Sequence, residues 1–465
     1  MNATCFSPAA NPLTQHAWYQ TAVFYHIYPL GMLGAERRND DAPPRCRLQN
    51  LTGMLDHLSN LCVTAIYIGP LFESSTHGYD TRDYYHVDRR LGTDEDFKHF
   101  VQACHQRGIR VIVDAVFNHV GREFWGFREV LQHRHEARTK DWFSDLRFDA
   151  PTPDGIGYNT WEGHGDLVKL NLDHAEVREH LFGAVAHWID HFQIDGLRLD
   201  AADCLTPGFI RALRQFTDAK APDFYLMGEV IHGDYRQWAN PQMLHGTTNY
   251  EAYKGIWSSH RDKNFHEIAY SLQRQFGHAG IYSDLAMYGF LDNHDTTRIA
   301  STLDNALDLY SAYALLFLMP GAPSLYYGSE WGIFGQKGRG YEADYPVRPH
   351  IQIQDIASGN LHGINNRASL CDAIAKLARC RHQCPTLAAG TYRQVAVSSQ
   401  WLVFERSGPE TVLCAVSALP THQDIVIPAP DGRYLDILNG GEVESKHGRL
   451  SLELYPNWAR VLKRL

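Results

Sequence analysis

Residues 110–119 read RVIVDAVFNH, a short run of β-branched residues that ends in Asp, Asn and His. The stretch before it, Asp94 to Arg107, has the amphipathic spacing of a helix, opens with an acidic first turn and closes at Gly108. A helix followed by a buried strand is the repeating unit of a parallel sheet. These residues therefore predict one such unit, with polar side chains where its strand ends.

The same unit recurs along most of the chain. Strand-like runs alternate with helical stretches such as Ala175 to Phe192. Eight strands within about 370 residues predict an α/β fold, a (β/α)8 TIM barrel. The expected strands are Thr21–Tyr28, Thr64–Ile68, Arg110–Val116, Gly196–Asp200, Phe224–Gly228, Thr247–Tyr250, Met287–Leu291 and Pro323–Tyr326.

Two segments depart from a bare barrel. Gly121 to Leu170 is too long for an ordinary loop after the third strand and predicts an inserted subdomain. After a last helix near Leu370 to Arg381, short alternating strands predict a C-terminal β-sandwich. We expect those strands at Tyr392–Val397, Trp401–Glu405, Thr411–Ser417, Gln423–Val426, Tyr434–Asp436 and Trp458–Leu462. The expected domains are a barrel over residues 1–120 and 171–382, a subdomain over 121–170 and a sandwich over 383–465.

The composition excludes several classes of protein. Apolar residues make up 44% and charged residues 21% of the 465 residues, which is typical of globular proteins and not of disordered chains. A net charge of -10 argues against a nucleic-acid surface, which needs clustered Lys and Arg. The N-terminus has no signal-peptide pattern, and no stretch approaches the ~20 apolar residues of a membrane span. Nine scattered cysteines without a CxxC pair favour neither a disulfide framework nor zinc. We therefore expect a cytoplasmic protein that binds neither nucleic acid nor membranes.

Polar side chains gather at the ends of the expected strands, where the active sites of TIM barrels lie. The third strand leads to Asp114, Asn118 and His119, the fourth to Arg198 and Asp200, the fifth to Glu229, and the seventh to Asp292, Asn293, His294 and Asp295. Three carboxylates, those of Asp200, Glu229 and Asp295, are thus expected at one mouth of the barrel.

These carboxylates match the needs of glycosidic bond cleavage, which uses one carboxylate as nucleophile and a protonated one as acid. Arg198 lies two residues before Asp200, on the same face of its strand, so its guanidinium can keep Asp200 ionised as the nucleophile. Glu229 follows an apolar strand and can keep its proton, so it is expected to act as the acid and later as the base. Asp295 is expected to bind sugar hydroxyls and stabilise positive charge on the ring.

Three other interpretations stay open. The strand-end Asp and Arg side chains could form structural salt bridges. The barrel could be a metal-dependent hydrolase with Asp114, His119, His294 and Asp295 as ligands, although the first strand has no His-x-His pair. A non-catalytic sugar-binding protein could use the same fold, but it would be expected to lack one of the carboxylates.

The strand-end segments resemble those of the α-amylase family of retaining glycoside hydrolases, glycoside hydrolase family 13. The matching segments are Asp114–His119, Gly196–Asp200, Met227–Val230 and Phe290–Asp295, with His77–Asp80 and Gly321–Gly328 also similar to family segments. The resemblance implies Asp200 as nucleophile, Glu229 as acid/base and Asp295 as transition-state stabiliser. It further implies that substrate is bound by Arg198, His119, His294, Tyr79, Asp80, His232 and Arg298, with Tyr79 as a stacking platform under the reacting ring.

Within that family, Glu229–His232 and Leu167–Asn171 look like segments of neopullulanases and cyclomaltodextrinases. Ile231 stands where that group usually has Trp, and Asp203 and Cys204 replace the Lys-His pair of typical α-amylases. The resemblance implies a hydrolase of short or cyclic maltodextrin-type α-gluco-oligosaccharides, with transglycosylation as the alternative. The linkage, α-1,4 or also α-1,6, stays open.

The expected partner is an oligosaccharide substrate, and a homodimer stays open. No cofactor or metal is expected: Asn118 stands where calcium-binding relatives have a ligand, but residues 121–170 contain no dense Asp/Asn loop, so calcium is kept only as the alternative. The insert and the loop from Gly332 to Tyr341 are expected to wall off the mouth, which favours short substrates.

Overall fold

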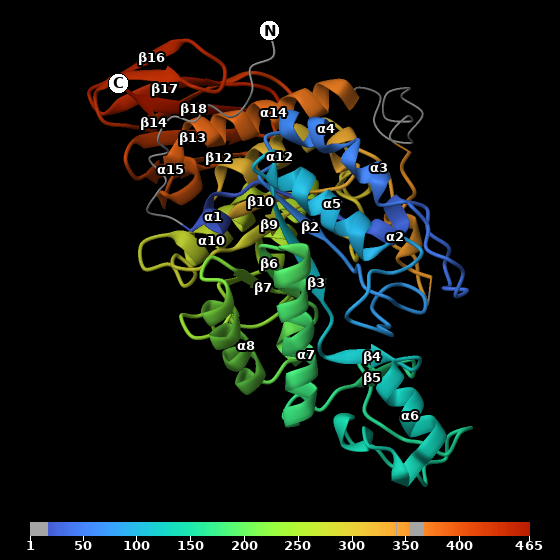
Figure 1. The fold of residues 1–465 in the computed structure, drawn as a ribbon. Helices are drawn as coiled ribbons and strands as arrows, with labels where there is room; N and C mark the ends of the chain where they lie inside the picture. The colour runs from blue at the N-terminus through green and yellow to red at the C-terminus, as the bar shows by residue number, and fades with distance from the viewer. Residues whose placement is uncertain (1–16, 341, 353–366) are drawn as a thin grey trace.

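The computed structural model describes residues 17–340, 342–352 and 367–465. Its larger part is a barrel of eight parallel strands (Figure 1). Neighbouring strands follow the order β8-β7-β6-β3-β2-β1-β10-β9, and a parallel bridge between Thr248 and Tyr288 joins the two ends. The strands are β1 (Phe24–Ile27), β2 (Ala65–Ile68), β3 (Arg110–Ala115), β6 (Gly196–Leu199), β7 (Tyr225–Gly228), β8 (Gly246–Thr247), β9 (Tyr288–Phe290) and β10 (Ala322–Tyr326). The TIM-barrel prediction is confirmed, and each expected strand has an observed counterpart, although the sixth, Thr247–Tyr250, shares only Thr247 with β8 because Tyr250 already begins a helix.

Helices surround the barrel (Figure 1). They are α1 (Trp18–Thr21), α2 (Pro29–Met32), α3 (Gln49–Thr52), α4 (Leu55–Asn60), α5 (Asp94–His105), α7 (Ala175–His187), α8 (Pro207–Lys220), α9 (Tyr250–Arg261), α10 (Phe265–Phe276), α11 (Ile299–Thr302), α12 (Asp308–Leu318), α14 (Arg367–Gln383) and α15 (Pro385–Ala389). Helix α5 begins with a capping box, in which the Thr93 and Asp96 side chains accept each other's backbone N–H. Helix α7 runs into a π-helical turn, η3 (Trp188–Phe192), so its predicted extent is confirmed. No helix of the described residues is long and apolar enough to cross a membrane.

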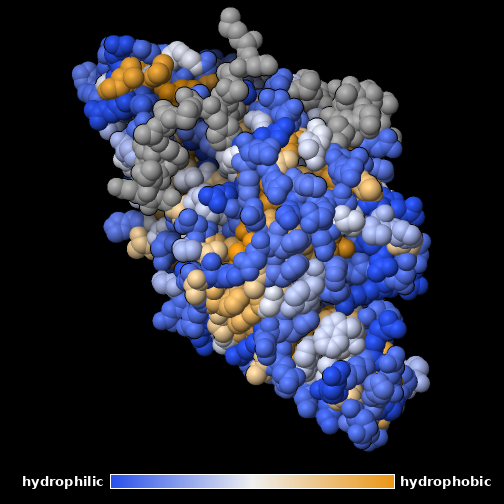
Figure 2. Space-filling model, in the orientation of Figure 1, coloured by the Kyte–Doolittle hydropathy of each residue, from blue (hydrophilic) through white to orange (hydrophobic). Residues whose placement is uncertain are grey.

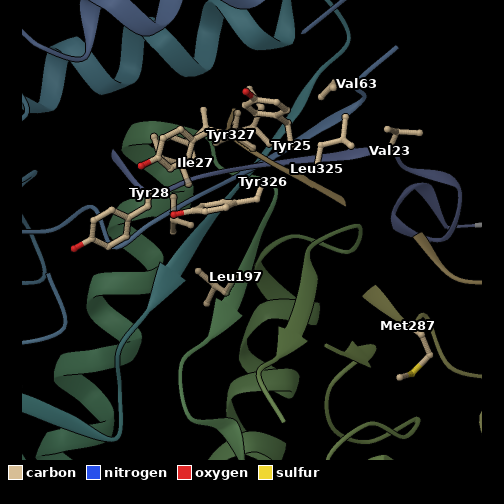
Figure 3. Packing of buried hydrophobic residues seen from close by; sticks show 14 of the residues in the cluster. Val23, Tyr25, Ile27, Tyr28, Val63, Leu197, Met287, Leu325, Tyr326 and Tyr327 are labelled. Carbon is tan, nitrogen blue, oxygen red and sulfur yellow. The ribbon is translucent and has the colours of Figure 1, made fainter. Parts of the chain in front are cut away.

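Successive residues of the barrel strands point to opposite sides, as strand geometry requires. In β1, Phe24 belongs to the cluster that fills the barrel, whereas Tyr25 and Ile27 pack outward against the helices. Figure 3 shows these outward side chains together with Leu325, on the neighbouring strand β10, and Tyr327, directly after that strand. Both faces of the strands are therefore buried, and the polar residues that end them are left to face the mouth, the opening at the carboxyl ends of the strands.

The segment after β3 forms a small lobe that extends from the barrel (Figures 1 and 2). Its base is an antiparallel pair, β4 (His119–Gly121) and β5 (Leu167–Lys169), and helix α6 (Trp125–His133) lies beyond it. Buried aromatic rings, among them Phe124, Trp142 and Phe143, form its core. The inserted subdomain is therefore present. Its predicted limits stay a prediction, since β4 already starts at His119.

The C-terminal part is an eight-stranded antiparallel sheet in the order β11-β12-β13-β18-β15-β16-β17-β14. The strands are β11 (Thr391–Val397), β12 (Trp401–Ser407), β13 (Thr411–Ser417), β14 (Gln423–Pro428), β15 (Gly432–Asp436), β16 (Glu442–Lys446), β17 (Arg449–Leu454) and β18 (Ala459–Arg464). Apolar side chains from both halves of this sheet, such as Leu413 on β13 and Leu452 on β17, form one cluster. Six of the eight strands were predicted. Strands β16 and β17 were not predicted, because charged residues crowd the exposed face of the β16–β17 hairpin and hide the strand pattern.

Two fully buried arginines lie where this sheet meets the barrel. Arg406, on β12, donates to the carbonyl oxygens of Leu318 (2.8 Å), Leu387 (2.8 Å), Gly390 (2.8 Å) and Thr391 (3.2 Å). Arg381, on α14, donates to the carbonyl oxygens of Phe317, Leu387 and Gly321. Burial removes water from both guanidinium groups, and it lowers the pKa of Arg381 to about 9 and that of Arg406 to about 10. These carbonyls include the last two of helix α12, which no intrahelical N–H can reach.

We predict that Arg406→Met lowers the free energy of unfolding by about 3 kcal/mol, because it leaves several buried carbonyl oxygens without a donor. Urea unfolding followed by circular dichroism would measure this. The matched control is Arg393→Met on the neighbouring strand β11, where the arginine is exposed and pairs with Glu405. That control should change the free energy by less than about 0.5 kcal/mol. Equal effects of the two substitutions would contradict the prediction.

Candidate active site

One buried guanidinium lies at the centre of the mouth. Arg198 Nη1 donates to Asp114 Oδ1 (2.8 Å) and to Asp200 Oδ1 (2.9 Å), and its Nη2 lies 2.8 Å from Glu229 Oε2. The sheet explains this convergence, because β3, β6 and β7 are neighbours and Arg198 pairs in register with Asp114 on one side. The arginine is 2% exposed. Three carboxylates from three strands therefore share one positive charge.

This sharing decides the protonation of Asp200 and Glu229. Burial raises the pKa of Asp200 well above its usual range, and the nearby Glu229 raises it further against the opposing effect of Arg198. Burial likewise raises the pKa of Glu229, again against Arg198. Since the two groups interact, they titrate as a pair. The pair therefore keeps a proton at a pH at which an exposed carboxyl has lost it, and it offers one acid and one carboxylate side by side.

The turn after β6 holds Glu229 in place. Ala201 has φ 42°, in the left-handed region that residues with a side chain rarely adopt. In this conformation its N–H donates to Glu229 Oε2 over 3.1 Å. The Tyr250 hydroxyl lies 3.4 Å from the other carboxylate oxygen, Oε1, and accepts a hydrogen bond from Asn293. Strained backbone of this kind is found most often at functional sites.

The third carboxylate, Asp295, has a different environment. Burial alone would raise the pKa of its carboxyl, but His294 and Arg348 outweigh burial and hold the pKa well below the usual range. His294 Nε2 lies 3.0 Å from Oδ2, and Arg348 Nη2 lies 2.7 Å from Oδ1. Arg348 also donates from Nε to the His294 carbonyl oxygen, over 2.8 Å. Asp295 is therefore ionised next to a pair that holds a proton.

Arg348 is a site residue that the sequence analysis missed. It follows a short 3-10 turn, η7 (Tyr345–Val347), and not a strand, so reading the strand ends could not find it. The only sequence signal at Arg348 is a cation four residues after Asp344, with which it forms an ion pair of 3.1 Å.

The other short turns of the described residues are η1 (Arg134–Glu136), η2 (Lys140–Trp142), η4 (Ala202–Cys204), η5 (Tyr235–Gln237) and η6 (Ser329–Trp331).

Two predicted sugar-binding residues line the same mouth. The Tyr79 hydroxyl donates to Asp114 Oδ2 (3.1 Å) and contacts His294 Nε2, and its ring stacks on the His294 ring. His119 is buried, and burial together with nearby His77 lowers its pKa to about 3, so it is neutral. Its Nε2 has no hydrogen-bond partner among the described residues. This nitrogen is itself buried, so its bond to a sugar hydroxyl stays a prediction.

Three further residues were predicted to contact the substrate, and their surroundings differ from those of Tyr79 and His119. Asp80 accepts from the Thr76 N–H and hydroxyl, so it holds the turn that carries Tyr79. Arg298 is completely buried, donates to the Tyr327 carbonyl and the Ser329 hydroxyl, and packs over the Tyr326 and Tyr327 rings. This burial leaves Arg298 no surface to offer a sugar, so it supports the loop after β10 instead. His232 is exposed on the loop after Glu229, and its contact with substrate stays a prediction.

The metal-dependent interpretation does not fit this arrangement. Among the described ranges, no group of three or more His, Cys, Asp or Glu side chains is placed to hold a metal ion. Asp114, one of the suggested ligands, is already bonded to Arg198 and to the hydroxyls of Tyr67 and Tyr79. Asn118 has a buried Oδ1 without a described partner, and its Nδ2 lies 3.2 Å from His119 Nδ1.

Comparison with known proteins adds an independent result. The family described as "Alpha amylase, catalytic domain" matches residues 35–370. The chain is 35% identical over 338 residues to a cyclomaltodextrinase from a Bacillus species, covering 69% of this chain and 60% of that protein. It is 32% identical over 341 residues to an intracellular maltogenic amylase from Bacillus subtilis, covering 69% of this chain and 57% of that protein. The chain therefore spans less than two thirds of the length of these two relatives.

Among solved structures, the chain resembles the cyclic α-maltosyl-(1→6)-maltose hydrolase from Arthrobacter globiformis in complex with cyclic α-maltosyl-(1→6)-maltose. The TM-score is 0.80 at 27% sequence identity, and the match covers 96% of this chain and 99% of that chain. The likeness therefore includes the barrel, the insert and the C-terminal sheet.

The electrostatics predict that Asp200→Asn stabilises the fold at pH 8 by about 1–2 kcal/mol. Folding raises the pKa of Asp200 above its value in the unfolded chain, which is about 4. As the pH rises from about 4 toward the pKa of the folded state, the wild-type carboxyl therefore lowers the stability of the fold. The amide carries no such cost, so the gain should vanish below about pH 4. Thermal unfolding at several pH values would measure it. Asp203→Asn, an exposed control, should show no such trend, and a variant less stable than wild type at pH 8 would contradict the prediction.

Proposed function

Because the chain belongs to the α-amylase family, we propose that it hydrolyses α-glucosidic bonds with retention of configuration at the anomeric carbon. The observation that carries this proposal is the grouping of Asp200 and Glu229 around Arg198, with a shared proton, next to an ionised Asp295. These are the groups that a two-step displacement at an acetal carbon needs.

In the first step, Glu229 donates its proton to the oxygen of the glycosidic bond. The Asp200 carboxylate attacks the anomeric carbon, the bond to the leaving sugar breaks, and a covalent glycosyl ester forms on Asp200. Asp295 is held ionised by His294 and Arg348, so its negative charge can stabilise the positive charge that develops on the ring. In the second step, Glu229 takes a proton from water, and the oxygen of that water displaces Asp200.

The geometry supports the retaining course. Retaining enzymes hold their two carboxyl groups about 5–5.5 Å apart, whereas inverting enzymes leave about 6.5–9.5 Å for a water. Asp200 and Glu229 lie on adjacent strands and bond the same guanidinium over 2.9 and 2.8 Å, which favours the short separation.

We propose short or cyclic α-gluco-oligosaccharides, joined by α-1,4 and α-1,6 bonds, as substrates. The names of the relatives support this class, since they include a cyclomaltodextrinase and a hydrolase of cyclic α-maltosyl-(1→6)-maltose. A relative named as intracellular supports a cytoplasmic location. The mechanism uses the protein's own carboxylates for both proton transfer and attack, so we propose that it requires no resident cofactor.

Two segments beside the site support the preference for short substrates. Trp161 of the insert lies 5.7 Å from the His119 ring, centroid to centroid. Lys337, in the loop that begins at Gly332, donates to the Asp295 carbonyl oxygen over 2.8 Å. Tyr341, the predicted end of that loop, lies outside the described residues. One segment therefore contacts His119 and the other contacts Asp295, and we propose that together they narrow the approach to the catalytic carboxylates.

We predict that Asp200→Asn and Glu229→Gln each reduce kcat by about a thousandfold or more while the protein stays folded, because each removes a group used in bond breaking. Turnover of maltotriose would measure the loss, with Asp203→Asn as the control that keeps its rate. With an activated fluorinated glycoside, Glu229→Gln should accumulate the glycosyl ester and Asp200→Asn should not, as mass spectrometry of the protein can show. Near wild-type turnover in either variant would exclude the mechanism.

We also predict that kcat/KM for maltotriose or a cyclic maltodextrin exceeds that for soluble starch by at least about tenfold, because a long polymer cannot pass between the bordering segments. Product chromatography and initial rates would test this. Comparable specificity constants for starch and for an oligosaccharide of a few glucose units would contradict it.

A further inference from the structure

A small pocket lies beside Arg348, between the segments that follow β1, β2 and β10. Its volume is about 290 Å³, and it is lined by Tyr28, Gly31, Thr76, His77, Tyr345 and Arg348 among other residues. In the barrel, β1 lies across from β7, the strand that leads to Glu229. The pocket therefore opens on the side of the mouth that is far from the proposed acid. Its volume is at the low end for small-molecule sites.

The proposed mechanism decides which part of a substrate this pocket receives. Glu229 protonates the oxygen of the leaving sugar, so the leaving group lies on the β7 side. The glycone, the part of the substrate that becomes bonded to Asp200, extends toward the opposite side. Arg348 connects the two regions, since it bonds Asp295 over 2.7 Å and its guanidinium lies 4.5 Å above the Tyr28 ring. The pocket is therefore placed to hold the glycone.

The base of the pocket is built by close packing of two segments, residues 29–37 and 342–351, which lie side by side in Figure 1. A Cβ atom on Gly31 would lie 2.4 Å from the Arg348 carbonyl oxygen, and one on Gly34 would lie 2.4 Å from the His350 ring. The Ile351 N–H donates to the Met32 carbonyl over 3.2 Å. Only glycine permits this approach, so the two segments are fixed against each other below the rim.

Above this base, Glu36 is locked in place. Arg47 binds both of its carboxylate oxygens, each over 2.9 Å, and Arg90 donates to its backbone carbonyl over 2.9 Å. The hydrogen bonds from Arg47 lower the pKa of Glu36 to about 2, so it stays ionised and bound. The chain at residue 36 is thus held by two cations, and the next side chain, Arg37, leaves from a fixed point.

Arg37 reaches across the rim to the other segment. Its guanidinium lies 4.1 Å above the centroid of the Tyr345 ring, and its Nη1 lies 2.7 Å from Glu342 Oε1. The side chains of Arg37 and Glu342 are 59% and 65% exposed, as expected for groups at the outer edge of a pocket. Planar stacking on an aromatic ring with a simultaneous ion pair is a geometry that Arg offers and Lys does not.

We propose that Arg37 closes the glycone end of the substrate site by joining Tyr345 and Glu342, and so limits how many sugar units bind on that side. This inference rests on the proposed function of the site. Because the contacts are solvent-exposed, they are weak. Arg37 therefore sets a preference among chain lengths that longer substrates can partly overcome, and it acts as a specificity-determining residue and not as a catalytic one.

The test compares kcat/KM for maltoheptaose with kcat/KM for maltotriose in wild type, Arg37→Ala, Tyr345→Ala and Arg37→Lys. The matched control is Arg38→Ala, which removes the same charge from the next exposed residue. We expect Arg37→Ala and Tyr345→Ala to raise the maltoheptaose/maltotriose ratio about fivefold, Arg37→Lys to raise it less, and Arg38→Ala to leave it unchanged. Melting temperatures within a few degrees of wild type would show that the variants are folded.

Each outcome has one meaning. A raised ratio in both Arg37→Ala and Tyr345→Ala, but not in Arg38→Ala, supports the closure. Hydrolysis of both sugars by wild type, with the same ratio in Arg37→Ala as in wild type, overturns the closure and leaves the proposed function intact. An equal rise in Arg38→Ala also overturns it, since charge alone would then be the cause. If wild type hydrolyses neither sugar, the proposed function fails and the closure fails with it.

Discussion

The arrangement of the mouth depends on one constraint, a single buried guanidinium surrounded by three carboxylates. Arg198 cannot neutralise all three carboxylates, and burial raises the pKa values of Asp200 and Glu229, so these two keep a proton between them. Burying charges in this way costs folding free energy, and the apolar layers inside and outside the strands provide the framework that tolerates the cost. His294 and Arg348 lie against the third carboxylate, Asp295, and hold it in the ionised form. The contacts that set the protonation states of these carboxylates are thus the same contacts that cost folding free energy.

The barrel and the grouping of Asp200, Glu229 and Asp295 at its mouth could be predicted from the sequence, because the strand ends carry a clear pattern of polar residues. A run such as residues 110–119 joins a buried strand to polar residues, and the parallel register then brings Asp114 beside Arg198. Arg348 and Arg37 could not be found in this way. Both lie in irregular segments, and their positions depend on the packing of chain parts that are about 300 residues apart, which no local pattern encodes. Arg298 shows the reverse case: its motif position suggested a sugar contact, but the loop after β10 encloses it.

The pocket beside Arg348 illustrates how a shared scaffold acquires an individual specificity. Barrel strands supply the reacting groups in fixed positions, while the loops that follow them differ freely in length and sequence. Here the floor of the pocket depends on glycines at 31 and 34, and its rim depends on exposed side chains. Changes at the rim are therefore cheap in stability, whereas changes at the floor are not.

The junction between the barrel and the C-terminal sheet has a consequence for how the molecule melts. Arg406, on β12, binds the Leu318 carbonyl oxygen at the end of α12, whereas Arg381 binds those of Phe317 and Gly321 from α14, a helix of the barrel. Detaching the sheet would therefore leave the buried Leu318 carbonyl oxygen without its donor from Arg406. One face of the sheet, with Leu402, Phe404 and Val412, belongs to the same apolar cluster as the barrel, so barrel and sheet should unfold in one calorimetric transition.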